Sequence, residues 1–179
     1  MQNPFNKTIL FILTVLPFVT FAQIVPVDEE TGNIMYREVV EEEGDKQDFF
    51  NRAVSWINEY YSNPVDVTKT RDPETGEIKG LHRLRLMNTL EDGTETPAGI
   101  VQYEFLLEFK EGRYRYTLTD FVLRQASKIP AEKWLDKEDP LYDVRYEDYL
   151  KQIDDFAMEW VTSLKEGMKP EVKSSDDNW

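Results

Sequence analysis

Two stretches of the chain place apolar side chains at the three-to-four-residue spacing of an amphipathic helix. The first is about 15 residues long; Asp45 can cap its start, and Asn63-Pro64 ends it because the residue before proline leaves helical geometry. The second runs over about 147–165. The apolar positions of the two stretches are Phe49, Phe50, Ala53, Trp56, Ile57 and Tyr60, and then Tyr149, Leu150, Ile153, Phe156, Ala157, Trp160, Val161 and Leu164.

Other stretches alternate apolar and polar residues or are rich in β-branched residues, as strands are. Residues 34–40 predict one strand, and residues 65–71 and 77–87 predict a hairpin around the turn at 72–76. Residues 100–110 and 113–123 predict a second hairpin around Glu111-Gly112, after a polar loop at 88–98. The sequence therefore predicts about five strands.

The second hairpin is specific enough to predict a register. If Glu111-Gly112 form the whole loop, apolar residues face apolar residues on one side of the sheet and charged residues pair on the other. The predicted apolar pairs are Phe109–Tyr114, Leu107–Tyr116, Phe105–Leu118 and Val101–Val122, and the predicted polar pairs are Glu108–Arg115 and Glu104–Thr119.

These elements predict an α+β fold, in which an antiparallel sheet of about five strands carries both helices on one face. Charged residues of the predicted strands then face water on the other side: Arg83, Arg85, Glu104, Glu108 and Arg115. We expect a single domain over 23–167 and a polar tail over 168–179.

The first 22 residues have the pattern of a secretory signal peptide. Residues 8–22 are apolar and too short for a permanent span, and Thr20 and Ala22 stand where signal peptidase requires small residues. An uncleaved membrane anchor is the alternative. After cleavage no stable membrane anchor is expected, and the location would be periplasmic or extracellular.

Composition removes several classes of function. The chain has 35 acidic and 21 basic residues and a net charge of −14, which argues against a nucleic-acid partner. It has no cysteine and one histidine, so thiol chemistry and His-rich or Cys-based metal centres are not expected. No glycine-rich phosphate loop is present, and we expect neither a cofactor nor a metal.

Three stretches carry a resemblance to a known family: residues 27–32, the helix segment 50–56, and the strand segment 112–121. Their order and spacing resemble those of a secreted bacterial domain of unknown function with a TATA-binding-protein-like (TBP-like) fold, over about 28–123. The resemblance implies a β-α-β4-α order. It brings no catalytic residues, and the fold label does not imply DNA binding, since fold does not fix function.

Four residues are weak candidates for a ligand-binding site. His82, Tyr103 and Asp120 share the predicted inner face, with Tyr103 directly opposite Asp120, and could form an acid–base cluster. The alternatives are a satisfied polar cluster at the end of the core, or residues that never meet. Trp134, in a loop between prolines, could stack on a sugar or could plug the open end of the core.

Two similar acidic turns, at 28–32 and 72–76, could suggest calcium. They lack the ligand spacing of a helix–loop–helix calcium site, and turn formation explains both without a metal.

The leading functional hypothesis is an exported, non-enzymatic binding or interaction module for a protein or small-molecule ligand. One alternative is a carrier that holds a small apolar ligand between the sheet and the last helix. A less favoured alternative is a carboxylate-based hydrolase that uses Asp120.

Overall fold

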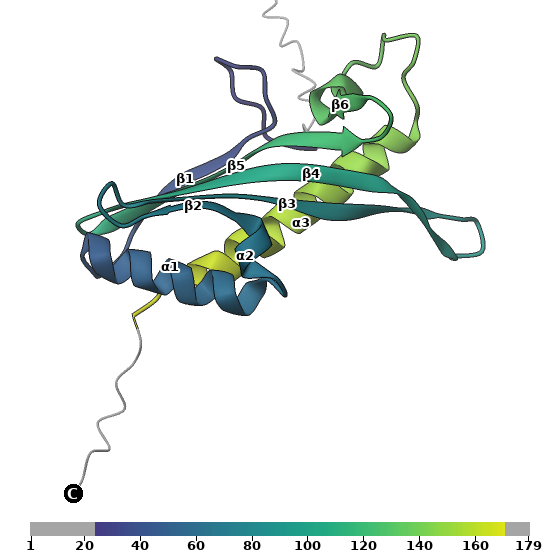
Figure 1. Cartoon of the computed structure of the whole chain (residues 1–179). Helices are drawn as coiled ribbons and strands as arrows, with labels where there is room; N and C mark the ends of the chain where they lie inside the picture. The colour runs from purple at the N-terminus through teal and green to yellow at the C-terminus, as the bar shows by residue number, and fades with distance from the viewer. Residues whose placement is uncertain (1–23, 171–179) are drawn as a thin grey trace, which may run out of the picture.

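The computed structural model describes residues 24–170 and shows a twisted antiparallel sheet with helices on one face (Figure 1). The predicted signal peptide and most of the predicted polar tail lie outside the described residues. In chain order the elements are β1 (Tyr36–Glu41), α1 (Lys46–Tyr60), α2 (Pro64–Val67), β2 (Thr68–Asp72), β3 (Glu77–Thr89), β4 (Glu95–Lys110), β5 (Arg113–Arg124), β6 (Lys128–Pro130), the 3₁₀ helix η1 (Ala131–Leu135) and α3 (Arg145–Gly167).

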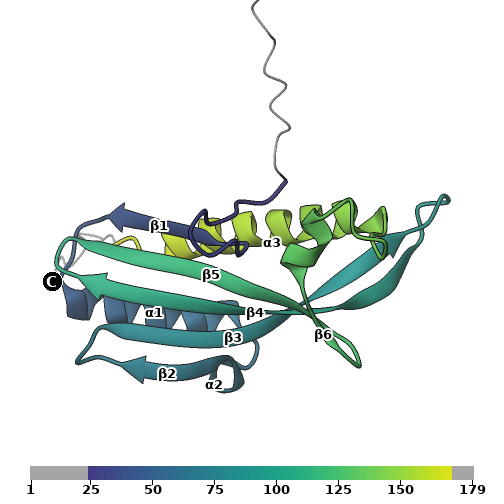
Figure 2. The same ribbon diagram turned by 90° about the horizontal axis from the view of Figure 1, so that it is seen from above.

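The sheet has six strands in the order β1-β5-β4-β3-β2, and the short β6 pairs with β5. Helices α1 and α3 lie under the same face of the sheet (Figures 1 and 2). We call the opposite face, which neither helix covers, the bare face. The predicted α+β class and the β-α-β4-α order of the main elements are confirmed. Strand β6 was not predicted; it lies in a stretch that carries no strand pattern. Among the described residues, no helix is both long enough and apolar enough to cross a lipid bilayer.

Helix α1 begins at a reciprocal cap. The side chain of Asp45 accepts hydrogen bonds from the backbone N–H groups of Gln47 and Asp48, at 2.7 and 2.8 Å, and Asp48 accepts one from the N–H of Asp45 at 3.1 Å. Three backbone N–H groups at the start of the helix are thereby satisfied. The cap confirms the start that the sequence predicts.

The segment after α1 corrects one predicted boundary. A strand was expected from residue 65, but Pro64–Val67 form a single helical turn, and β2 begins at Thr68. Proline fixes φ near the helical value and needs no hydrogen-bond donor at the first helical position, so Pro64 favours a new turn of helix here. The consequence is that β2 is much shorter than β3.

The β4–β5 register agrees with the prediction from the turn as far as the Glu104–Thr119 pair, and then it shifts. Val101 pairs with Leu123 rather than with Val122, because Asp120 and Phe121 together face Tyr103 in a β-bulge. Asp120 has a φ of 55°, a left-handed conformation that Asp tolerates better than most residues. After the bulge the buried positions are Phe121 and Leu123, so the predicted Val101–Val122 pair is wrong.

Strands β3 and β4 pair with each other and extend into the predicted loop. Residues 88–98 were expected to form a loop, but pairing continues to Asn88–Thr96 and Thr89–Glu95, with a register shift after Leu86. The extended arm projects beyond the helices (Figure 1). Polar residues are tolerated in these strand ends because they have no core to cover.

The core between helices and sheet is rich in aromatic rings. Phe105 lies against Trp160, with ring centroids 5.6 Å apart, and is stacked on Tyr61 at 6.0 Å. The ring of Phe105 also covers Gly80, whose missing side chain leaves the space for it: a Cβ built on Gly80 would lie 2.1 Å from the Cζ of Phe105. Large rings thus fill many of the inward positions of β4 and β5, and Gly80 of β3 leaves the space for one of them.

Candidate functional site

A chain of hydrogen bonds joins three buried aromatic residues beside the predicted cluster. The indole N–H of Trp160 donates to the hydroxyl of Tyr61 at 2.7 Å, and the hydroxyls of Tyr61 and Tyr103 lie 3.2 Å apart. Burial raises the pKa of Tyr61 and of Tyr103 above the ordinary value, so both phenols stay neutral at physiological pH. These groups satisfy one another and form part of the core.

His82 lies at the edge of this chain. Its ring meets Tyr61 edge-on at 5.0 Å and Tyr103 at 6.1 Å between centroids. Burial, and secondarily the charge of Arg83, lowers the pKa of His82 below its ordinary value, so the imidazole is uncharged at pH 7. His82 therefore offers a neutral, half-buried ring rather than a cation.

Asp120 does not join His82 and Tyr103. The bulge places Phe121 on the inner face beside Tyr103, with ring centroids 6.1 Å apart, and leaves Asp120 exposed. The expected Tyr103–Asp120 opposition is thus replaced by a Tyr103–Phe121 stack. His82 and Tyr103 therefore lie together, whereas the carboxylate of Asp120, which an acid–base cluster would need, lies away from them.

Trp134 is almost completely buried, at 1% exposed. In η1 it stacks on Tyr146, with centroids 5.3 Å apart and planes 15° from parallel, and meets Tyr149 at 5.9 Å. Its indole N–H is the one buried side-chain polar atom without a hydrogen-bond partner among the described residues. The ring closes the end of the core near the start of α3 and presents no face to a sugar.

The two acidic turns bind their own backbone. Asp28 accepts hydrogen bonds from the N–H and hydroxyl of Thr31, and Asp72 accepts from the N–H of Thr75. These bonds lower the pKa of both carboxyl groups. Gly76 has a φ of +74°, as the turn requires. Across residues 24–170, no three His, Asp or Glu side chains gather as metal ligands.

One hollow of the surface lies where the end of α1, the middle of β3 and the middle of α3 meet. It has a volume of about 750 Å³. Aromatic and aliphatic side chains form much of its wall, and charged groups stand at its rim. The lining residues include Tyr60, His82, Arg83, Leu84, Arg85, Asp155, Phe156 and Glu159.

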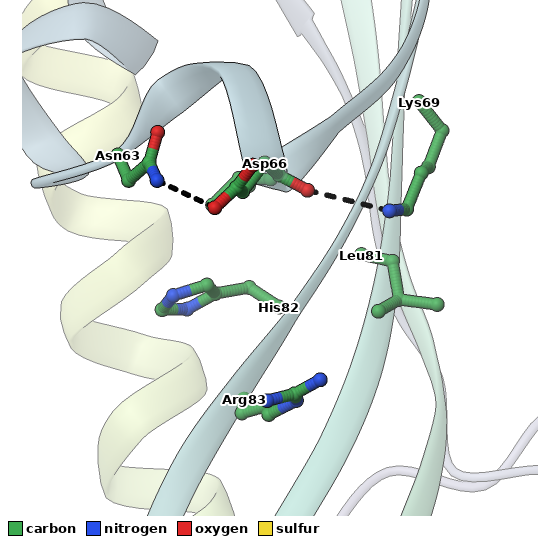
Figure 3. Close-up of a pocket in the computed structure, with 7 residues that line it drawn as sticks. Asn63, Asp66, Lys69, Leu81, His82 and Arg83 are labelled. Carbon is green, nitrogen blue, oxygen red and sulfur yellow. Dashed lines mark hydrogen bonds between the residues drawn. The ribbon is translucent and has the colours of Figure 1, made fainter.

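A second hollow of about 420 Å³ adjoins the first and shares Asn63, His82 and Arg83 with it (Figure 3). On its α2 side, the amide of Asn63 donates to Asp66, and Lys69 donates to the backbone carbonyl of Asp66. These bonds hold α2 against the start of β2. We call the two hollows together the β3 groove.

Sequence reasoning missed Gln152, which lies at the far end of the β3 groove. Its side-chain amide pairs with the backbone of Met87: the N–H of Met87 donates to Oε1 at 2.9 Å, and Nε2 donates to the carbonyl of Met87 at 2.8 Å. Gln152 thus contacts the edge of β3 as a neighbouring strand would. The only sequence signal was its position one residue before the apolar Ile153 on α3.

Comparison with known proteins identifies the family of the chain. Residues 36–124 match the model of a domain of unknown function with TBP-like fold, DUF4468. The chain belongs to the DUF4468 family. The match includes β1 to β5 and therefore the strands of the β3 groove, whereas α3 lies beyond it.

Two solved structures share the DUF4468 fold. A TBP-like protein from Parabacteroides distasonis superposes with a TM-score of 0.65 at 16% identity, covering 82% of this chain and 97% of that one. A DUF4468 family protein from Bacteroides ovatus gives a TM-score of 0.65 at 16% identity, covering 84% of this chain and 94% of that one. At this identity the likeness shows the fold alone. No curated protein matches the chain.

Proposed function

We propose that this DUF4468 protein is a non-enzymatic binding module and that the β3 groove is its binding surface. The observation that carries the proposal is the groove itself, about 750 Å³ in its main part, with neutral rings inside and charged groups at the rim. Interfaces combine aromatic anchors with a polar rim in this way. The predicted signal peptide supports a place of action outside the cytoplasm, in the periplasm or beyond.

Several observations favour binding over catalysis. His82 and Tyr103 meet without Asp120, and Tyr61 and Tyr103 have pKa values raised by burial, which suits hydrogen bonding within the core rather than proton transfer. The exposed Asp120 has no partner from the proposed cluster. The best candidate of the hydrolase hypothesis, Asp120, therefore lies outside the cluster in which it was expected.

The carrier hypothesis gains no support from the interior. A small apolar ligand would need space between the sheet and α3, but Tyr103, Phe105 and Trp160 are each no more than 2% exposed and contact one another or their neighbours there. The groove lies beside these rings and opens to the surface. A ligand would therefore be bound at the surface and would leave the core packing unchanged.

The proposal is tested by site-specific photo-cross-linking in the organism that makes the protein. A benzophenone amino acid replaces Glu159 in the groove wall, and in a matched control it replaces Leu141, which is 83% exposed and lies outside the groove. We expect a discrete adduct at position 159, none at 141, and a weaker adduct at 159 when Tyr60 on the facing wall is changed to Ala. No adduct at 159, or equal adducts at both positions, would overturn the proposal.

A further inference from the structure

Strand β3 has an open edge along the groove. Strand β2 pairs with β3 only as far as Thr68–Gly80, whereas β3 continues to Thr89. Figure 2 shows β2 beside only the first part of β3. Among the described residues, no strand pairs with this edge beyond Gly80. The edge is therefore open from residue 81 until Gln152 contacts Met87.

The backbone groups on this edge can be assigned from Met87. Both the N–H and the C=O of Met87 point to Gln152, and alternate residues of a strand present their backbone groups to the same side. The register shift after Leu86 adds its extra residue, Ala98, to β4, so the alternation along β3 continues through it. Arg85 and Arg83 consequently turn their N–H and C=O groups toward the open edge. Such a row of donors and acceptors is a template for another strand.

Resting on the proposed function, we infer that the β3 groove binds its partner by strand addition: an extended peptide pairs with the open edge of β3 between Gly80 and Met87. The edge accommodates a peptide of about six residues, or roughly 20 Å of extended chain. α2 limits it at one end, and Gln152 limits it at the other. Main-chain hydrogen bonds give affinity in this mode, and alternate side chains give specificity.

The side chains around the edge define the chemistry of the peptide. Leu84 is buried on the inner face, so Arg83 and Arg85 stand on the bare face of the sheet. Within residues 24–170, neither guanidinium has a carboxylate at ion-pair distance. One set of alternate peptide side chains would lie beside these two cations, which favours Asp or Glu there.

The other set of peptide side chains enters the groove. There it meets the neutral rings of Tyr60, His82 and Phe156. Aromatic or branched aliphatic side chains bury most area against such rings. The partner that fits is therefore an extended segment in which acidic and apolar residues alternate.

The positive charges of Arg83 and Arg85 also disfavour a second copy of this chain as the partner on the open edge. Antiparallel pairing of two β3 edges would bring Arg83 and Arg85 of one copy beside those of the other, and like charges across strands are destabilising. Positive charge on an open edge is a common protection against self-association. The acidic peptide avoids this repulsion.

The experiment uses the full protein and two displayed hexapeptide libraries of equal composition. In one library acidic residues alternate with Phe, Tyr, Val, Ile or Leu; in the other, the acidic and apolar residues are grouped in blocks. We expect the alternating library alone to be enriched. An enriched peptide should slow hydrogen exchange of the Arg83 and Arg85 amides about tenfold or more, as new backbone hydrogen bonds do.

Two variants and a modified peptide localise the contact. Changing both arginines, R83E with R85E, should weaken binding about tenfold or more. K79E should not, because β2 already pairs with the backbone of β3 at Lys79, so the peptide cannot pair with the edge there. N-methylation removes the backbone N–H donors of the peptide. Methylation of every second residue should abolish binding when these residues face β3, and should leave binding unchanged when the methylated positions are shifted by one residue.

Three outcomes would overturn strand addition. The first is that the alternating library is not enriched. The second is that a peptide binds without slowing hydrogen exchange at Arg83 and Arg85. The third is that these amides become more protected in the free protein as its concentration rises, which would show that a second copy occupies the edge. Each leaves the photo-cross-linking result at position 159 standing, so failure of this inference is distinguishable from failure of the proposed binding module.

Discussion

Replacing Gly80 by alanine tests the packing of the core where β3 meets the aromatic rings. A Cβ at this position would lie 2.1 and 2.2 Å from Cζ and Cε1 of Phe105, far inside van der Waals contact. Phe105 is 2% exposed and lies between Tyr61 and Trp160, so its ring cannot move without displacing them. The substitution must therefore strain a closely packed region.

The size of the effect follows from two opposing contributions. Overpacking a core costs about 1–3 kcal/mol, and the rigid neighbours of Phe105 favour the upper part of that range. Alanine in place of glycine within a strand returns roughly 0.5–1 kcal/mol. We expect Gly80→Ala to lower the free energy of unfolding by about 2 kcal/mol.

Urea unfolding monitored by tryptophan fluorescence measures this change, since the midpoint should fall while the slope stays constant. Phe105→Leu supplies the matched control. Alone, Phe105→Leu should lower the free energy of unfolding by about 1–3 kcal/mol through lost contacts. The double variant with Gly80→Ala should lose less stability than the sum of the losses in the two single variants. If Gly80→Ala is neutral or stabilising, or if the two changes are additive, the ring does not lie where the structure places it.

Three further changes probe other elements. Asp45→Ala removes the cap of α1 and should lower the free energy of unfolding by about 1 kcal/mol in urea unfolding; an unchanged midpoint would contradict the cap. At the bulge, Asp120→Gly should be neutral or slightly stabilising because φ is 55°, whereas Asp120→Val should cost about 1–3 kcal/mol; equal midpoints for both variants would refute the bulge. Hydrogen bonds from Lys165 and then Tyr116 lower the pKa of Glu38, so its contribution to stability is complete above the unfolded pKa and is lost as pH falls through the lower folded pKa. An NMR titration should give Glu38 a midpoint below that of Glu38 in the Lys165→Ala variant, and identical midpoints would exclude the contact.

The elements were predictable where periodicity is local and uninterrupted. The stripe from Phe49 to Tyr60 and the alternation on either side of Glu111-Gly112 each depend on neighbouring residues, and the register to Glu104–Thr119 follows from a two-residue turn. The bulge was not predicted because alternation assumes one residue per position. A signal was present nevertheless: the large apolar residues of β5 change from even to odd positions between Leu118 and Phe121.

The site was less predictable than the fold. His82 and Tyr103 were placed on the correct face, but their relation to Asp120 depended on a register that one extra residue changes. The groove depends on the difference in length between β2 and β3, to which the helical turn at Pro64 contributes because it delays the start of β2. The contact of Gln152 with Met87 joins residues far apart in the chain, and no local pattern indicates it.

The bulge at Asp120 also affects how relatives of this protein should be compared. Without that residue, Phe121 would directly oppose Tyr103, and Leu123 would keep its inward direction, so the interior would be the same in a chain one residue shorter. An alignment drawn without a gap through this strand would then match inward residues of one chain with outward residues of the other. For such a shorter chain, a gap at Asp120 would restore the structural correspondence from Phe121 onward.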